Sequence, residues 1–377
     1  MAERTASSGA VSFPAEIRRY SRHLLIPEVG LSGQRRLANA RALVVGAGGL
    51  GSPVLQYLTA AGVGRIGAID GDTVDLTNLQ RQTVFATADI GTNKAVAAVR
   101  RLTALNPAIA IDALPIDLDA GNAREIVRLY DVVVDCTDRF STRYLINDAC
   151  VLEKKPDVYG SIFRFDGQVS VFGQEGGPCY RCLYPQAPPP GSVPTCAEGG
   201  VLGALAGIVG AWQASEALKL LLEIGEPLSG RLLLIESLGA RTREVRFTRD
   251  PECALCGDAP ALHDVAADEP AGEAPEFEEI EAADLDAALG SARLLDVREP
   301  HEAVLGTLEE AISMPASQLH QRMHELDTAV RYVVACRVGA KSLWAARELR
   351  AAGFGRLIHL RGGLLAYAAS RPEFEFF

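Results

Sequence analysis

The chain has 377 residues, a length typical of two or three domains, and 23% of its residues are charged, as in ordinary folded proteins. Its net charge of −11 argues against a surface that binds nucleic acid or an anionic membrane, because both carry negative charge themselves. We find no signal peptide and no apolar run long enough to cross a membrane, so we expect a cytoplasmic protein whose eight cysteines are reduced.

The first two thirds of the chain alternate short apolar runs with helical patterns. Residues 1–18 show no periodicity and predict a flexible N-terminus, and residues 19–262 form the first predicted domain. Buried strands are predicted at 42–47, 65–70, 109–115 and 131–138. Helices are predicted between them, at 52–62, 92–106 and 121–130. This order predicts an α/β fold with a doubly wound, Rossmann-like parallel sheet.

The first predicted strand runs into the stretch "VVGAGGLGSP". There Gly46, Gly48 and Gly51 fit the pattern G-x-G-x-x-G, which places a pyrophosphate at a helix N-terminus. Asp70 ends the next predicted strand, where a dinucleotide site holds the ribose. An NAD(P) oxidoreductase is therefore one interpretation of this loop.

Three charged residues near predicted strand and helix ends favour ATP over a dinucleotide. Arg81 and Lys94 can stabilise the charge of a triphosphate under attack, which a hydride-transfer site has less need to do. Asp138 ends the last of these predicted strands, where a carboxylate can hold Mg²⁺ beside phosphate oxygens. Together they predict a triphosphate site.

The rest of the first domain has a different pattern. Residues 167–173 and 230–248 alternate apolar and polar side chains and predict an antiparallel extension of the sheet. The apolar, glycine-rich stretch 199–225 has helical periodicity, and we expect a buried helix there.

The cysteines separate into groups by their spacing. Two C-x-x-C pairs predict a closed structural zinc site with four thiolate ligands: Cys179, Cys182, Cys253 and Cys256. Cys136 and Cys150 lie in apolar segments and are expected in the core. The six histidines show no spacing typical of a metal site or a catalytic triad, and we expect them to be structural or surface residues.

A segment rich in Ala, Pro, Glu and Asp at 263–277 predicts a linker, and residues 278–377 form a second, small α/β domain. In that domain Cys336 opens the loop "CRVGAKS", between a predicted strand and a predicted helix. Such a loop can direct several backbone N–H groups at an anion, and Lys341 adds a positive charge. We therefore expect a thiolate or persulfide on Cys336 to be stabilised.

Seven motifs of the first domain occur together in order: "RYSRHLLIPEVG", "GAGGLGSP", "DGDTVDLTNLQRQ", "DCTDRFSTRYLINDAC", "GSIFRFDGQVSVF", "PCYRCLYP" and "CAEGGVLG". This set, from about 19 to 257, resembles the ubiquitin-activating-like adenylyltransferases. The branch it resembles most activates sulfur-carrier proteins in molybdopterin and thiamine synthesis. The resemblance also supports the zinc site.

The resemblance implies a role for individual residues. Gly49 would lie against the ATP phosphates, and Asp70 would bind the ribose. Lys94 would contact phosphate, and Asp138 would hold Mg²⁺. The nucleotide would be wrapped by a short segment of five residues: Thr77, Asn78, Leu79, Gln80 and Arg81.

Three further positions follow from the same resemblance. Arg22 resembles an arginine that these enzymes extend across a homodimer interface into the partner's site. Cys196 matches a cysteine that can form an acyl thioester or a disulfide with the carrier. Relatives often have Asn where this chain has Arg139, which would either lose that contact or bring another cation to the triphosphate.

The second domain resembles rhodanese domains through "LLDVREPHE", "CRVGAKS" and "LIHLRGGLLAY". Two positions depart from the usual pattern. Lys341 stands where Arg is common, and Thr307 lies in "GTLEEAISMP", which replaces the usual Gly-His-x-Pro-Gly-Ala segment. A bidentate anion contact thereby becomes a point charge.

The two resemblances together imply a fused enzyme. It would adenylate the C-terminal Gly-Gly of a ubiquitin-like sulfur carrier and then transfer sulfur from a Cys336 persulfide, giving a thiocarboxylate. The sulfur donor would be a cysteine desulfurase or thiosulfate. A first alternative keeps adenylation and makes the second domain a docking module, and an NAD(P) oxidoreductase or a non-enzymatic scaffold is a more remote one. The sequence leaves the carrier and its pathway open.

Overall fold

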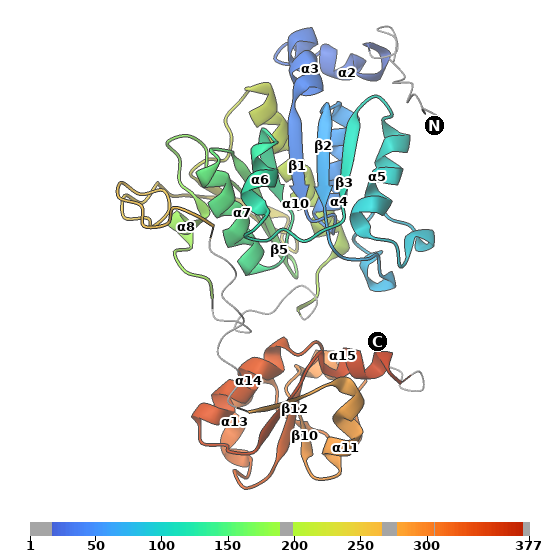
Figure 1. Cartoon of the computed structure of the whole chain (residues 1–377), viewed down its shortest axis with the longest axis vertical. Coiled ribbons are helices and arrows are strands. Elements are labelled where there is room, and N and C mark those ends of the chain that lie inside the picture. Colours follow the sequence, from blue (N-terminus) through green and yellow to red (C-terminus); the bar gives the residue numbers. More distant parts are fainter. Residues whose placement is uncertain (1–16, 189–198, 266–276, 305, 372–377) are drawn as a thin grey trace, which may run out of the picture. The chain divides into compact units, whose positions relative to one another are not determined.

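The computed structural model describes residues 17–188, 199–265, 277–304 and 306–371. The described residues form two compact units (Figure 1). The first takes in those of Met1–Ala187 and Val201–Asp268, and the second takes in those of Pro188–Gly200 and Glu269–Phe377.

The first unit is built on an eight-stranded sheet, with neighbouring strands in the order β3-β2-β1-β4-β5-β6-β7-β8. The first five strands in the chain run parallel, and the other three pair antiparallel. Their bounds are β1 Arg41–Val45, β2 Arg65–Ile69, β3 Ala110–Leu114, β4 Val132–Asp135, β5 Asp157–Phe163, β6 Asp166–Phe172, β7 Arg231–Glu236 and β8 Arg241–Arg246. This architecture confirms the predicted α/β sheet with an antiparallel extension.

Helices cover both faces of this sheet, so its central strands are apolar on both sides. In β1, Ala42 and Val44 pack with one set of helices, and Leu43 and Val45 pack with the other. The first set is α3 (Gly30–Asn39), α4 (Gly51–Ala61), α5 (Lys94–Leu105) and α10 (Gly203–Leu222). The second set is α6 (Ala123–Arg128) and α7 (Phe140–Leu152).

Two features of the first unit differ from the expectation. The helix expected to be buried, α10, leaves Ile208 and Trp212 45% and 41% exposed, so only one of its faces packs on the sheet. Strand β1 ends at Val45 rather than at 47, because Gly46 has a φ of +92° that extended strands do not adopt.

The second unit holds a five-stranded parallel sheet in the order β11-β10-β12-β13-β9. The strands are β9 Glu278–Ile280, β10 Arg293–Asp296, β11 Ile312–Ser313, β12 Tyr332–Ala335 and β13 Leu357–Leu360. Its two faces are covered by α13 (Leu319–Arg322) and α14 (Ala340–Ala351) on one side, and by α11 (Leu285–Leu289) and α15 (Gly363–Ala369) on the other. Each unit therefore has a core of its own.

Both ends of the predicted linker pack on a unit. Asp264 pairs with Arg124 at 3.0 Å, and Val265 is 8% exposed in the core of the first unit. Phe277 packs against the core of the second unit.

Candidate functional site

The glycine loop joins the end of β1 to the start of α4 with no room for side chains at two positions. A Cβ on Gly46 would lie 3.0 Å from the carbonyl oxygen of Cys136, and one on Gly51 would lie 1.9 Å from the carbonyl oxygen of Gly46. Glycine is therefore required by close backbone approach as well as by the positive φ of Gly46. The loop leaves the N-terminal end of α4 at the edge of the sheet, which suits an anion.

Asp70 ties this loop to the end of β2. Its carboxylate accepts a hydrogen bond from the Ala47 N–H at 2.8 Å and another from the Asp72 N–H at 3.0 Å. Burial raises the pKa of the Asp70 carboxyl, while the nearby Lys94 charge acts in the opposite direction. The predicted ribose ligand thus also fixes the loop.

An acidic residue that the sequence analysis missed, Asp72, lies among the predicted cations. The buried Lys94, the first residue of α5, places its Nζ 2.9 Å from Asp72 Oδ2. The hydrogen bond from Lys94 lowers the pKa of the Asp72 carboxyl, and the charge of Arg139 adds to this effect. The structure therefore brings Lys94 and Arg139 to the same edge of the sheet. Only the position of Asp72 two residues after Asp70 could have signalled it.

The predicted nucleotide-wrapping segment is a short turn beside the glycine loop. Thr77 and Asn78 lie in a 3₁₀ turn, Leu76–Asn78, and Leu79 follows it. The Arg81 guanidinium donates to the Thr77 carbonyl oxygen at 3.1 Å.

This turn also contacts the glycine loop and the start of α10. A Cβ on Gly49 would lie 3.4 Å from the Arg81 Cγ. A Cβ on Gly203 would meet the Gln80 carbonyl oxygen at 2.3 Å. The turn is therefore held against both elements.

Asp138 lies in the turn between β4 and α7, and its side chain is exposed. The turn is fixed from both sides. Thr137 donates its N–H and its hydroxyl to the buried Asp135 Oδ1 at 2.9 and 2.7 Å. Arg143 of α7 donates to the Thr137 carbonyl oxygen at 3.1 Å. Burial raises the pKa of Asp135, which the Arg143 charge opposes.

The structure thus gathers most of the predicted nucleotide residues at the carboxyl ends of β1, β2 and β4. Arg22 is an exception, because its helix α2 (Ser21–Leu24) precedes the start of β1, whereas the glycine loop follows its end (Figure 1). Cys196 lies outside the described residues.

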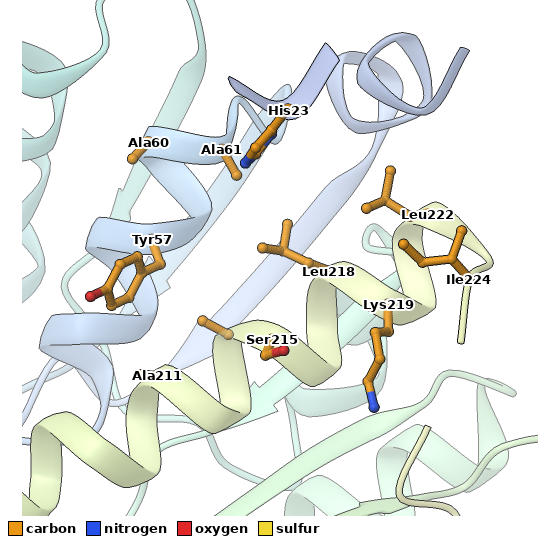
Figure 2. Close-up of a pocket in the computed structure, with 11 residues that line it drawn as sticks. His23, Tyr57, Ala60, Ala61, Ala211, Ser215, Leu218, Lys219, Leu222 and Ile224 are labelled. Atoms are coloured by element: carbon orange, nitrogen blue, oxygen red, sulfur yellow. The ribbon is translucent and has the colours of Figure 1, made fainter. Parts of the chain in front are cut away.

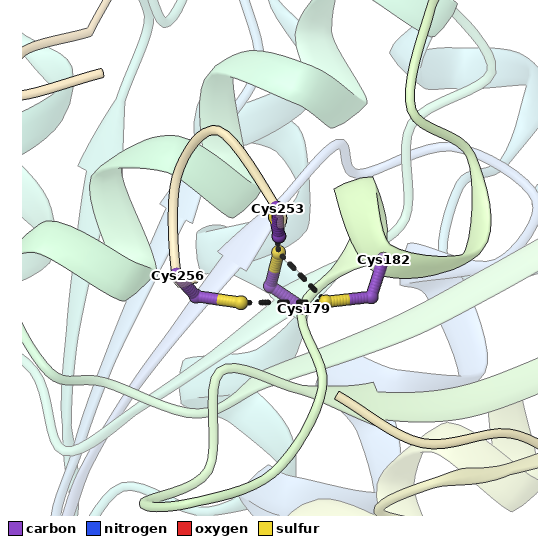
Figure 3. A group of neighbouring side chains, drawn as sticks. All are labelled: Cys179, Cys182, Cys253 and Cys256. Carbon is purple, nitrogen blue, oxygen red and sulfur yellow. Dashed lines mark hydrogen bonds between the residues drawn. The ribbon is translucent and has the colours of Figure 1, made fainter. Parts of the chain in front are cut away.

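The four paired cysteines form one cluster, whose sulfur atoms all lie within 4.8 Å of one another (Figure 3). Three of the sulfur–sulfur distances are 3.3, 3.6 and 3.9 Å. Tetrahedral ligands about 2.3 Å from a zinc ion would lie roughly 3.8 Å apart, so the donor set and its size fit zinc. Cys179 caps α8 (Tyr180–Leu183) and Cys182 lies within it, whereas the other two follow β8.

In the second unit, Cys336 follows β12 directly and is fully buried. The Gly339 N–H donates to its sulfur at 3.1 Å, and the Ser342 hydroxyl lies 3.5 Å from it. Gly339 is the N-cap of α14, so the helix N-terminus lies close behind the sulfur. This is the arrangement expected for an anionic sulfur.

Lys341 is already engaged by another residue, which the sequence analysis did not anticipate. Its Nζ lies 2.7 Å from Oε2 of Glu302 in α12 (Pro300–Ala303), whose side chain is buried, and the Lys341 side chain is 13% exposed. Lys341 therefore brings no uncompensated charge to the loop. Thr307 lies 3.5 Å from Asp296 through its hydroxyl.

Comparison with known proteins decides the family. The model of the ThiF family matches residues 20–255, and the model of the rhodanese-like domain matches residues 281–370. The chain belongs to the ThiF family. The rhodanese-like domain follows it in the same chain, so both predicted resemblances are confirmed.

Relatives of this ThiF family member include proteins that match nearly the whole chain. Sulfur carrier protein adenylyltransferase of Thermus thermophilus is 53% identical over 66% of this chain and 94% of its own length. Probable adenylyltransferase/sulfurtransferase MoeZ of Mycobacterium tuberculosis is 44% identical over 94% of this chain and 93% of its own. Adenylyltransferase and sulfurtransferase MOCS3 of Mus musculus is 45% identical over 81% of this chain and 70% of its own length.

Among solved structures, MccB of E. coli in complex with MccA-N7isoASN superposes with a TM-score of 0.58 at 24% identity, over 63% of this chain and 74% of that one. At this identity the likeness concerns the fold alone. Within the described parts of this ThiF family member, no helix has the length and apolar character needed to cross a membrane.

Proposed function

We propose that this protein adenylates the C-terminal Gly-Gly of a ubiquitin-like sulfur carrier and then converts it to a thiocarboxylate with sulfur from Cys336. The observation that carries the first step is the gathering of Asp70, Lys94 and Arg139 with the glycine loop at one sheet edge. Relatives named as adenylyltransferases and sulfurtransferases over nearly the whole chain support both steps.

In the first step the carrier carboxylate attacks the α-phosphate of ATP and pyrophosphate leaves. Negative charge builds on the phosphates, so preorganised cations lower the barrier. Arg81 and Lys94 are the proposed sources of this charge. Asp138, exposed on a fixed turn, is the proposed ligand of Mg²⁺, which would neutralise the phosphates when bound.

In the second step the terminal sulfur of a Cys336 persulfide attacks the acyl carbon, and AMP leaves with its electron pair. The product is an acyl disulfide. Attack on that disulfide by the Cys196 thiolate would release the thiocarboxylate and leave a disulfide between Cys196 and Cys336. A dithiol reductant would then restore both thiols. This chemistry needs reduced cysteines, which fits the predicted cytoplasmic location.

A structural zinc on the four-cysteine cluster completes the first unit in this proposal. It would do no chemistry, because four thiolates leave no open coordination position.

A second copy of the chain is part of the same proposal. Helices α4 and α10 leave three large side chains 41–55% exposed to solvent: Tyr57, Ile208 and Trp212. Together they form an apolar surface that a partner could bury. A pocket of about 440 Å³ lies between these helices, with His23 at one end (Figure 2). Arg22 is exposed and directly precedes His23, so it lies beside this pocket. This position supports the proposal that Arg22 acts in the partner's site rather than in the site of its own chain.

Carrier-dependent exchange of labelled pyrophosphate into ATP tests the first step. Arg81→Ala and Asp138→Ala should each abolish exchange, and tight NAD(H) binding without ATP binding would restore the oxidoreductase interpretation.

Cys336→Ser tests the second step. It should keep exchange and yield no thiocarboxylate, since a hydroxyl cannot carry the sulfur. A wild-type thiocarboxylate yield in Cys336→Ser would leave a docking role for the second unit.

A further inference from the structure

Strand β13 carries a buried histidine that the proposed chemistry does not use. His359 is 5% exposed. Its Nδ1 lies 2.7 Å from Glu279 Oε1 on the neighbouring strand β9, and its Nε2 lies 2.9 Å from the carbonyl oxygen of Gly339. A carboxylate and a carbonyl only accept hydrogen bonds, so both contacts are hydrogen bonds only when both ring nitrogens carry a proton.

Gly339 connects this histidine to the sulfur of Cys336. Its N–H donates to the sulfur at 3.1 Å, and its carbonyl oxygen accepts from the Ser342 hydroxyl at 3.0 Å as well as facing His359. The Ser342 hydroxyl is also 3.5 Å from the sulfur. Since Ser342 has one hydroxyl hydrogen, it can serve the carbonyl or the sulfur at one time, but not both.

We propose that His359, paired with Glu279, is a positioning residue for the sulfur that Cys336 carries. As an imidazolium it donates to the Gly339 carbonyl oxygen beside the Ser342 hydroxyl and weakens the bond from that hydroxyl, so that the hydroxyl turns more readily to a thiolate or persulfide. A neutral ring whose single proton faces Glu279 would leave the carbonyl to Ser342 and remove that donor from the sulfur. The inference rests on the proposed function of Cys336.

Other charged groups near this end of the sheet have partners of their own. Arg361 pairs with Glu281 at 3.3 Å, and Lys341 pairs with Glu302 at 2.7 Å. Glu279 is therefore the carboxylate that faces the His359 ring.

The test follows the rate at which iodoacetamide alkylates Cys336 in the full chain, by mass spectrometry of the peptide that contains it. His359→Leu removes the donor and should slow alkylation at neutral pH by about three- to tenfold, the range for the net loss of one ordinary hydrogen bond. His359→Gln keeps an amide donor and should stay within about twofold of wild type. Glu281→Gln removes the neighbouring carboxylate without touching the ring, and as the matched control it should alkylate like wild type.

A double-mutant cycle with Ser342→Ala separates this role from general loosening of the loop. If His359 acts through the Ser342 hydroxyl, Ser342→Ala alone should slow alkylation as much as His359→Leu, and the double variant should be no slower than either. Wild-type alkylation in His359→Leu, or effects that multiply in the double variant, would overturn the proposal.

Nitrogen-15 NMR of the histidine-labelled wild-type chain gives a reading that does not depend on how a variant folds. The proposal requires a proton on both nitrogens of the His359 ring, and one bare nitrogen would contradict it. Persulfide loading of wild-type Cys336 by a cysteine desulfurase tests the proposed function separately. Failure there would refute the sulfur-carrying role, whereas the alkylation comparison would still decide the role of His359.

Discussion

Asp157 and Glu153 are carboxyl groups of the first unit with opposite surroundings. Asp157 is 2% exposed, and its Oδ1 has no hydrogen-bond partner among the residues that the structure describes. Burial raises the pKa of Asp157 well above its ordinary value, and the Asp135 charge on the neighbouring strand raises it further. Glu153 accepts hydrogen bonds from Arg128 and Arg124, which lower the pKa of that carboxyl to about 2. The two groups should therefore affect stability in opposite directions with pH.

We predict that Asp157→Asn stabilises the first unit at high pH. The pKa of Asp157 is higher in the folded chain than in the unfolded chain, where it is about 3.9. The protonated Asp157 therefore contributes its full stability below about pH 3.9, and this contribution is lost as pH rises through the folded pKa. The variant should therefore unfold at a higher temperature than wild type at pH 8 and at nearly the same temperature at pH 4. The chain has two tryptophans, so in a Trp344→Phe background the fluorescence of Trp212 reports this unit.

Glu153→Gln is the opposite-sign control for that measurement. Its carboxylate contributes stability above the unfolded pKa of about 4.3, and this contribution is lost as pH falls toward the folded value of about 2. The variant should therefore be less stable than wild type at pH 7, with the difference shrinking as the solution becomes acidic. If Asp157→Asn changed the unfolding temperature by the same amount at pH 8 and at pH 4, the raised pKa of Asp157 would be contradicted.

At the scale of elements, an ion pair joins Glu302 of α12 to Lys341 of α14 in the Cys336 loop. Glu302→Gln leaves the largely buried Lys341 ammonium without its counter-charge, and removing one partner of a buried pair costs about 3 kcal/mol. We therefore predict a lower unfolding temperature of the second unit, reported by Trp344 in a Trp212→Phe background. Thiosulfate should restore this temperature in the variant more than in wild type, because the dianion replaces the lost carboxylate.

The same variant should also load more persulfide onto Cys336 from thiosulfate than wild type does. The exposed Glu309→Gln removes one carboxylate from the same unit without touching Lys341, and it should match wild type in both measurements. If Glu302→Gln neither gains stability from thiosulfate nor loads more sulfur, Lys341 has a purely structural role.

The cysteine cluster ties α8 to the segment that follows β8, and we predict that zinc there stabilises the first unit. Tyr180, between the paired cysteines, packs its ring 5.1 Å from that of Tyr144 and 5.4 Å from that of Tyr159. Metal analysis should give about one zinc per chain, and chelation should lower the unfolding temperature, since metal binding is coupled to folding. Cys182→Ser should lose the metal and Cys150→Ser should keep it. A metal-free chain of unchanged stability would refute the prediction.

The elements that the sequence predicted well are those with a clean period. Strands β1 to β4 are short apolar runs, and α4 and α5 show helical spacing, so their bounds were found to within three residues. Strand β5 and helix α7 were not predicted, because β5 continues after two residues into β6 and the α7 stretch was recognised only as a motif. Apart from the cluster of the two C-x-x-C pairs, contacts across long separations could not be predicted. Lys341 and Glu302 are 39 residues apart, and no spacing rule connects His359 to Gly339.

At the scale of the whole molecule, the chain joins two units that each have a core and a candidate reactive centre. The nucleotide residues lie at the carboxyl ends of strands in the first unit, and Cys336 follows a strand end in the second. Both placements agree with the rule that open α/β sheets bind ligands beyond the carboxyl ends of their strands. Adenylation and sulfur transfer should therefore be separable by mutation, as the proposed variants require.

The last prediction concerns the proposed dimer. Arg22 lies at the opposite end of β1 from the glycine loop, so a role for it in adenylation requires the site of a second chain. Arg22→Ala and Asp138→Ala should each be inactive in pyrophosphate exchange. When the two proteins are mixed and allowed to exchange subunits, each mixed dimer has one site that combines an intact Asp138 with an intact Arg22 from the partner. Partial recovery of exchange activity is the expected result, at most about half of the wild-type rate per mixed dimer because only one of its two sites is complete.

Two preparations of Arg22→Ala mixed in the same way are the control and should stay inactive. If subunit exchange is demonstrated by mass spectrometry and no activity returns, Arg22 acts within its own chain or has no part in adenylation.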